Sequence, residues 1–280
     1  MLDRIFLMLI LLSLKSNLNK FRPALIIVLL QLALFLSNNV SMQAAESLGD
    51  PFEGNALKNP NWKWSNEPKK WDLGKTREGW LTITGEFNRN LWGDDQSNRL
   101  YQKHSGDFHV ETHLIHDYRD GSTVQGIVAL SPTSNAPNKG NAPDWVTLKL
   151  WGRGAGEGNT AVLQYQARQR DGDPGLTGTA AAYGKVKQGA LPIFMRMQRK
   201  KDKFTTWFKL KEKDKWNLVG EHELKLKDPL QVSIYSGIAE APGAAKLTAH
   251  FEYFKDLDNP FPVEVQNKLT TTWGTLKQAY

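Results

Sequence analysis

The stretch NRNLWGDDQSNRLYQKHSGDFHVETHLIH, from Asn88 to His116, decides the fold. Its two turns, Gly93-Asp94-Asp95 and Ser105-Gly106-Asp107, frame two predicted strands, about Arg99–Lys103 and Phe108–His116. The second strand alternates between two sets of side chains, Phe108, Val110, Thr112 and Leu114 against His109, Glu111 and His113. A period of two indicates a strand with one buried face and one polar face.

The same alternation recurs along the chain. Further strands are expected at Gly79–Gly85, Thr123–Ser131, Asp144–Trp151, Thr160–Gln169, Ile193–Arg199, Phe204–Lys211, Trp216–Leu218, Gln231–Ser236 and Ala245–Lys255. In the last of these, Leu247, Ala249, Phe251 and Tyr253 alternate with Thr248, His250, Glu252 and Phe254. About a dozen short strands with almost no helical period predict an all-β sandwich or jelly roll.

Both ends of the chain depart from this pattern. In the tail, apolar residues at helical spacing (Val265, Leu269, Trp273, Leu276 and Tyr280) predict a short amphipathic helix over 263–278. At the start, Lys15, Lys20 and Arg22 precede the apolar run Ala24–Leu36, and small residues follow up to Ala45. This order is typical of a secretory signal, and the run is short for a membrane span of about 20 residues.

We therefore expect three regions: a signal peptide at 1–45, a β-sandwich at 46–256 and a tail with a short helix at 257–280. Export would place the protein in the medium, in the periplasm or on the cell surface. The alternative is an uncleaved N-terminal segment, which would anchor the chain to a membrane.

Charge and cysteine content exclude several classes of protein. The net charge is +7, and removal of residues 1–45 lowers it to +4 because four cations and one anion are lost. This mild excess is spread along the chain and does not indicate a nucleic-acid partner. With no cysteine, the protein has neither disulfides nor thiolate metal sites.

The outward positions of the strands give a candidate ligand-binding face. One set of side chains on these strands is expected to point to the core: Val146, Leu148, Leu150, Met195, Met197, Phe204 and Phe208. The opposite set then points outward: Trp145, Lys149, Trp151, Arg196, Trp207, Glu111 and, if its strand follows the same pattern, Gln125. Aromatic faces beside hydrogen-bonding side chains are typical of a carbohydrate groove. The alternative is that a partner domain or the tail helix covers these tryptophans.

His109, Glu111 and His113 share one strand face, which raises a metal site as a hypothesis. Successive same-face positions are about 7 Å apart, so these side chains do not converge easily on one ion. A solvated polar face is the favoured interpretation. Four further tryptophans, Trp62, Trp64, Trp71 and Trp80, could form a sugar platform, but core and corner packing is favoured.

An ordered series of short motifs resembles the concanavalin A-like lectin/glucanase superfamily. The series is Trp62-Lys-Trp64-Ser-Asn-Glu67-Pro68, Trp71-Asp-Leu, Gly79-Trp-Leu-Thr-Ile, Leu91-Trp92-Gly93, Leu100-Tyr-Gln102, Gly106-Asp-Phe-His-Val-Glu-Thr112, Gln125-Gly-Ile-Val, Trp145-Val-Thr-Leu-Lys149 and Phe251-Glu-Tyr-Phe254. Within the superfamily it is most similar to the regulation-of-enolase-like group, akin to the β-sandwich appended to some bacterial β-xylosidases. The resemblance covers roughly Leu48–Asp256 and implies two curved antiparallel sheets packed face to face.

The resemblance also bears on function. Glucanases of this superfamily carry Glu-x-Asp-x-x-Glu on one strand, and this chain has no such motif. The expectation is therefore an exported, non-catalytic, lectin-like module that binds a polysaccharide and is not an enzyme. The alternatives are a structural or protein-interaction domain and, less favoured, a glycoside hydrolase. No cofactor is expected. A structural calcium ion is an alternative for which family analogy offers Asp94 and Asp95, and the pair Asp50 and Asp256, but turn formation explains Asp94 and Asp95 equally well.

Overall fold

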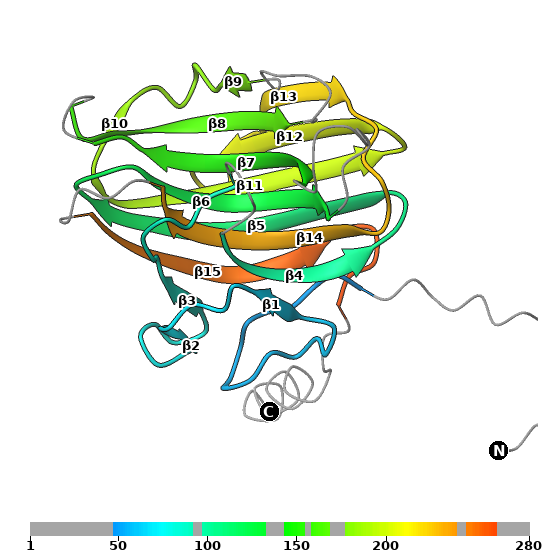
Figure 1. The fold of residues 1–280 in the computed structure, drawn as a ribbon, viewed down its shortest axis with the longest axis horizontal. Helices are drawn as coiled ribbons and strands as arrows, with labels where there is room; N and C mark the ends of the chain where they lie inside the picture. Colours follow the sequence, from blue (N-terminus) through cyan, green and yellow to red (C-terminus); the bar gives the residue numbers. More distant parts are fainter. Residues whose placement is uncertain are drawn as a thin grey trace, which may run out of the picture. The chain divides into compact units, whose positions relative to one another are not determined.

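Two antiparallel β-sheets stacked face to face form the folded part of the chain (Figure 1). The computed structural model describes residues 47–91, 97–132, 143–154, 158–168, 177–239 and 245–261. These residues contain no α-helix, and accordingly none that is long and apolar enough to cross a membrane. The predicted all-β sandwich of two antiparallel sheets is confirmed, whereas the predicted helix at 263–278 lies outside the described residues.

The first sheet has eight strands, of which seven form the path β1-β4-β14-β6-β7-β8-β10, and β9 pairs with β8. Their bounds are β1 Lys63–Ser65, β4 Asn98–His104, β6 Thr123–Ser131, β7 Asp144–Gly152, β8 Thr160–Arg168, β9 Thr177–Thr179, β10 Val186–Lys187 and β14 Leu230–Ile238. Its middle strands, β14, β6, β7 and β8, follow the predicted ranges closely. Polar and apolar side chains alternate in β7 and β8, whereas β6 is a mostly apolar run that is buried along its whole length.

The second sheet has seven strands in the order β13-β12-β11-β5-β15-β3-β2. Their bounds are β2 Trp71–Leu73, β3 Leu81–Thr84, β5 Phe108–Arg119, β11 Gly189–Lys200, β12 Lys203–Lys209, β13 Asn217–Glu223 and β15 Lys246–Asp256. Strand β5 is central and pairs with β11 on one side and β15 on the other. The short strands β1, β2, β9 and β10 were not predicted, because two or three residues are too few to show a period.

The core lies between the sheets and consists of the side chains predicted to face inward. Val110, Leu114, Leu148, Met195 and Phe204 are each fully buried within one apolar cluster. Three of the four N-terminal tryptophans pack as expected: Trp62 lies in this cluster, and Trp64 and Trp71 pack against it. Trp80 is buried outside the cluster, with its ring against that of His113. The strand faces inferred from alternation are therefore confirmed for β5, β7, β11 and β12.

Strand β15 departs from strict alternation. Its pairing with β5 shifts register between Phe251 and Tyr253, which marks a β-bulge. After the bulge Phe254 is buried and Tyr253 is partly exposed. The prediction that Tyr253 shares the inward face of Phe251 is thus wrong, because one extra residue in a strand reverses the facing of every residue beyond it.

Core and edge leucines should respond differently to truncation. Leu148→Ala removes a side chain that is 0% exposed and should lower the free energy of unfolding by about 2–5 kcal/mol. Leu218→Ala, at a position 58% exposed on edge strand β13, should change it by about 0.5 kcal/mol or less. Urea denaturation measures both, and equal losses would contradict the assigned strand faces.

A buried histidine makes stability depend on pH. His116 is fully buried on the inward face of β5, where its Nε2 lies 3.2 Å from the Thr123 hydroxyl. Burial lowers the pKa of His116 from 6.5 to about 3. Between these values the unfolded chain binds a proton at this histidine and the folded chain does not. The contribution of His116 to the free energy of unfolding is therefore constant above pH 6.5, and stability falls as the pH drops toward 3.

Replacement of this histidine should flatten the acid limb of the stability curve. Between pH 6.5 and pH 3, the free energy of unfolding of the wild type should fall by about 1.4 kcal/mol for each pH unit. The stability of His116→Gln should fall much less over the same pH range. The pH dependence that remains is due to His109 and His250, because burial lowers their pKa values as well. Urea denaturation at pH 7, 5.5 and 4.5 tests this, and identical slopes in both proteins would refute it.

Candidate active site

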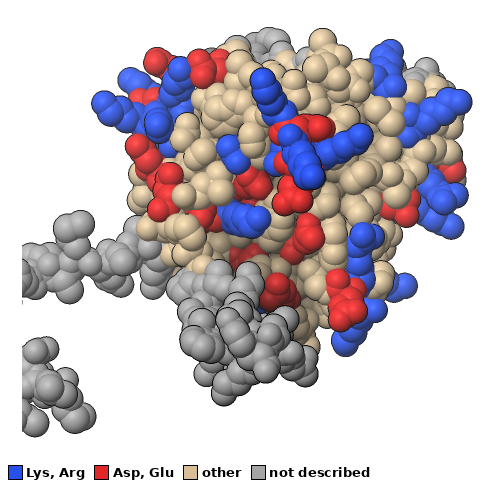
Figure 2. Space-filling model, turned by 180° about the vertical axis from the view of Figure 1, so that it is seen from behind, with Lys and Arg blue, Asp and Glu red and all other residues tan. Residues whose placement is uncertain are grey.

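The outer face of the seven-stranded sheet carries a row of side chains across four adjacent strands. Trp207 on β12 lies opposite Arg196 on β11, Arg196 opposite Glu111 on β5, and Glu111 opposite Lys255 on β15. Figure 2, which views the molecule from behind, shows acidic and basic side chains side by side on this face. Three of the seven residues predicted to bind ligand, Glu111, Arg196 and Trp207, therefore lie together.

Glu111 is the centre of this row. Its side chain is 9% exposed, and both carboxylate oxygens are hydrogen-bonded. Oε2 accepts from Arg196 Nη2 at 2.6 Å and Nε at 3.2 Å, and Oε1 accepts from the Tyr253 hydroxyl at 2.7 Å. A guanidinium that donates through two nitrogens stabilises the charged carboxylate and fixes its orientation.

Tyr253 reaches Glu111 because of the bulge in β15. Without the register shift, its side chain would point into the core with Phe251. Burial and the neighbouring Glu111 raise the pKa of Tyr253 well above its usual range. The hydroxyl thus stays protonated and donates to the carboxylate. The sequence signal for this arrangement was the run Phe251-Glu-Tyr-Phe254, in which three aromatic side chains cannot all follow one alternation.

A second carboxylate lies on the same face. Glu252 Oε2 is 2.6 Å from His113 Nδ1, and the Glu252 side chain is 42% exposed. His113 is held in turn by a parallel ring stack on Phe194, with centroids 4.0 Å apart, and by the edge of Trp80. The face therefore presents one buried and one accessible carboxylate. Reasoning from the sequence included Glu111 but missed Glu252.

Aromatic rings line this part of the sheet. The Arg196 guanidinium lies 4.0 Å from the ring centroid of Trp216, which sequence reasoning placed in a strand but not in the site. Lys209 Nζ lies 4.9 Å from the rings of both Phe194 and Trp216. Trp207 packs against His109. The less favoured hypothesis of a metal site at His109, Glu111 and His113 finds no support in this geometry, because each of the three side chains contacts a different neighbour.

The remaining four predicted residues do not belong to this face. Trp145, Lys149 and Trp151 lie on β7, in the other sheet, so the expectation that they share one surface with Trp207 is wrong. Trp145 is 1% exposed, in a separate apolar cluster with Val128 and Tyr235, and is not available for stacking on a sugar. For β7 and β12, alternation gave the correct side of the strand but not the sheet to which the strand belongs.

Gln125 lies inside the sandwich. It is fully buried and pairs with Leu150 and Ser236, and it shares the core-facing side of β6 with Ile127 and Ala129. Its prediction as an outward ligand-binding residue is therefore wrong. Neither amide atom of its side chain has a hydrogen-bond partner within the described parts of the chain.

The candidate calcium ligands have other roles. Asp50 accepts hydrogen bonds from the amides of Phe52 and Asn59 and from the indole of Trp62. Asp256 accepts from the amides of Leu48, Asp258 and Asn259. These aspartates tie the start of the fold to its last strand. Asp94 and Asp95 lie outside the described residues, among which no group of His, Asp and Glu is placed to hold a metal ion.

The comparisons with known proteins show that several solved structures share this fold. No protein-family model matches the sequence, and no curated protein matches it. The fold is similar to the Bacteroides ovatus protein described as xyloglucan PUL GH43B (TM-score 0.56, 13% identity, 77% of this chain and 40% of that chain). It is also similar to a xylan β-1,4-xylosidase from Bacillus halodurans (TM-score 0.54, 17% identity, 75% and 38%). A Saccharomyces cerevisiae protein of unknown function matches over 98% of its length and 72% of this chain (TM-score 0.52, 16% identity).

These similarities correct the expected function. The absence of Glu-x-Asp-x-x-Glu led us to expect a non-catalytic, lectin-like module, yet two of these solved chains are glycoside hydrolases. That expectation, and the expectation that the chain is not an enzyme, are contradicted by them. The match spans about two-fifths of each hydrolase chain, 40% and 38%, and at these identities it establishes the shared fold. The case for a reaction therefore has to be built from the residues of this chain.

The contact between Arg196 and Glu111 should appear as energetic coupling. Arg196→Ala should lower the free energy of unfolding by about 1.5–3 kcal/mol, because it removes charge-assisted hydrogen bonds from a buried carboxylate. The same change in a Glu111→Gln background should cost less, by a coupling energy of about 0.5–3 kcal/mol. Lys203→Ala is the control, since its pair with Glu221 is exposed and should contribute about 1 kcal/mol or less. Equal costs of Arg196→Ala in both backgrounds would show that the pair is not coupled.

Proposed function

We propose that the protein hydrolyses glycosidic bonds in a polysaccharide, with the reaction centred on Glu111 and Glu252. The observation that carries this proposal is the pair of carboxylates in different surroundings on one sheet face. Glycosidases use two carboxyl groups, one as a proton donor and one as a nucleophile or base. Different surroundings are what allow two similar groups to take these different roles.

Glu111 suits the role of nucleophile or base. Its two oxygens are fixed by the contacts to Arg196 and Tyr253. A carboxylate held in one orientation loses little freedom when it attacks a sugar carbon or orients a water molecule. Tyr253 positions this carboxylate from the neighbouring strand.

Glu252 suits the role of proton donor. Its partly exposed carboxyl can reach a glycosidic oxygen at the surface, and His113 lies within hydrogen-bond distance to exchange a proton with it. Glu111 and His113, the partner of Glu252, are two positions apart on β5, which is about 7 Å along the strand. Glycosidases that admit a water molecule between their two carboxyl groups hold them roughly 6.5–9.5 Å apart.

The surroundings favour a neutral sugar polymer. Trp216, Trp207 and Phe194 offer apolar ring faces beside the carboxylates, and sugars present apolar faces to such rings. The names of the similar solved proteins, a xylan xylosidase and a xyloglucan-locus protein, make xylan and xyloglucan the first substrates to test.

Three sequence expectations complete the proposal. The protein would be exported through residues 1–45, it would carry its sandwich at 46–256, and within the shared fold it would stand nearest to the regulation-of-enolase-like group. Export is supported by the order of basic, apolar and small residues at the N-terminus. The similarity to the regulation-of-enolase-like group is supported by the order of the motifs, and it implies nothing about the reaction.

Reducing-sugar release from xylan and xyloglucan by the full chain tests the activity. Glu111→Gln and Glu252→Gln should each lower the rate by about 10²–10⁴-fold, as removal of an acid or base commonly does. Glu221→Gln, on the edge strand β13 and paired with Lys203, should leave the rate unchanged. Circular dichroism of each variant separates lost activity from lost folding.

Two outcomes would overturn the proposal. One is the absence of product from both polymers and from their oligosaccharides when folded wild-type protein is used. The other is activity that survives in the folded Glu111→Gln and Glu252→Gln variants.

A further inference from the structure

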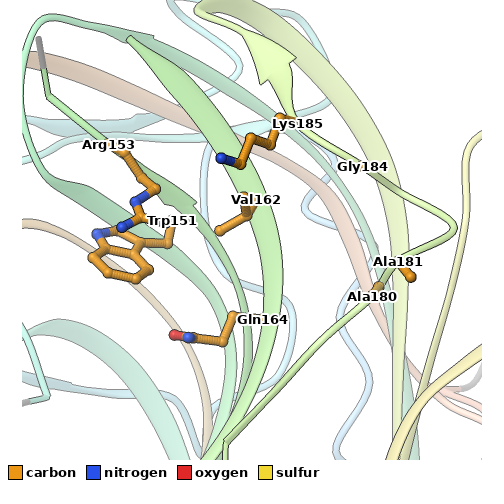
Figure 3. A pocket seen from close by; sticks show the side chains of 8 residues that line it. All are labelled: Trp151, Arg153, Val162, Gln164, Ala180, Ala181, Gly184 and Lys185. Carbon is orange, nitrogen blue, oxygen red and sulfur yellow. The ribbon is translucent and has the colours of Figure 1, made fainter. Parts of the chain in front are cut away.

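The outer face of the eight-stranded sheet carries a pocket that the proposed reaction does not use. Its volume is about 320 Å³, at the lower end of the roughly 300–1,000 Å³ of small-molecule sites. Strands β7 and β8 and the segment before β10 form its walls (Figure 3). It is on the sheet opposite to that of Glu111, so its occupant need not be the substrate that is cleaved.

The polar groups of the pocket are cationic or neutral. Arg153 and Lys185 contribute positive charge, and Gln164 contributes an amide. Figure 3 shows the Lys185 ammonium and the Gln164 amide directed toward the space beside Trp151. Among the described residues that line the pocket there is no acidic side chain. The lining therefore attracts an anion.

A third cation lies beside the pocket. Lys149 is the cross-strand neighbour of Gln164, and its Nζ lies 5.8 Å from the Trp151 ring centroid. This ammonium is buried and donates to the neutral Gln166 Oε1 at 2.7 Å. Burial lowers the pKa of Lys149 to about 8. A nearby anion would offset this loss of hydration, because opposite charges stabilise each other in a poorly solvated site.

The other walls are apolar. Trp151, Val162 and Ala180 line the pocket beside the polar groups. The Trp151 indole is fixed by a hydrogen bond to Ser122 at 3.0 Å and by Arg153, whose guanidinium lies 4.6 Å from the ring centroid. A small inorganic anion would leave these walls without a partner. A sugar ring with a carboxylate provides an apolar face, hydroxyls for the amide and a negative charge.

We propose that this pocket binds a uronate, a sugar residue with a carboxylate, and so gives the protein a second carbohydrate site. Lys185 and Arg153 bind the carboxylate, Gln164 binds a hydroxyl, and Trp151 contacts the ring. Such a site would hold an acidic polysaccharide on one sheet while the other sheet acts on a glycosidic bond. The second site itself does not depend on hydrolysis at Glu111.

Calorimetric titration of the full-length protein with trigalacturonate tests this site, with neutral galactotriose and inorganic phosphate as comparison ligands. Trigalacturonate should bind at least tenfold more tightly than either. Lys185→Ala should weaken its binding at least tenfold, and higher salt should weaken it as well. Lys187→Ala is the matched control, because Lys187 is an exposed lysine two positions along the chain that does not line the pocket. It should change affinity less than twofold.

The outcomes are distinguishable from those of the proposed function. Trigalacturonate should bind Glu111→Gln as tightly as it binds the wild type, whether or not any polymer is hydrolysed. Equal binding of galactotriose would overturn the proposal, as would equal effects of Lys185→Ala and Lys187→Ala. Phosphate binding as tight as that of trigalacturonate, or no binding of trigalacturonate at all, would overturn it too.

Discussion

The pairing of β5 with β11 on one side and β15 on the other is the constraint on which the rest of the structure depends. This register places Phe108, Val110 and Leu114 in the core and, by the same alternation, places Glu111 and His113 on the outer face. A slip of one residue would bury the Glu111 charge and expose the core residues. The hydrophobic contacts that hold the sandwich together therefore also set the position of the candidate site.

The site combines this rigid register with one local irregularity. The largely buried Glu111 carboxylate depends on its hydrogen-bond partners, since a buried polar group without partners is costly. Arg196 comes from the regular pairing with β11, whereas Tyr253 comes from the bulge in β15. Bulges commonly re-aim a side chain next to a functional site. Glu252 keeps the outward facing of the regular alternation, so the bulge brings the Tyr253 hydroxyl to the face that already carries both carboxylates.

Much of the fold could be predicted from the sequence, and the site only in part, for one physical reason. A period of two tells which side of a strand is buried, which is why the faces of β5, β7, β11 and β12 were correct. It does not tell which sheet a strand joins, so Trp151 and Trp207 were assigned to one surface although they lie on different sheets. It also does not show where the period breaks, so Tyr253 was placed in the core. The absence of the Glu-x-Asp-x-x-Glu motif could not exclude a reaction, because carboxylates on different strands, such as Glu111 and Glu252, have no fixed spacing in the sequence.

The central claim is that a neutral polysaccharide is bound on the outer face of the seven-stranded sheet, around Glu111. The tryptophan indole N–H resonances of the Glu111→Gln variant test this directly, because Trp207 and Trp216 lie on that face and Trp145 and Trp151 lie on the other. Each resonance can be assigned by substitution of its tryptophan with phenylalanine. During titration with xylo-oligosaccharides and xyloglucan oligosaccharides, the account predicts that the resonances of Trp207 and Trp216 shift while those of Trp145 and Trp151 do not. Shifts confined to Trp151, or no shift with any of these sugars, would contradict it.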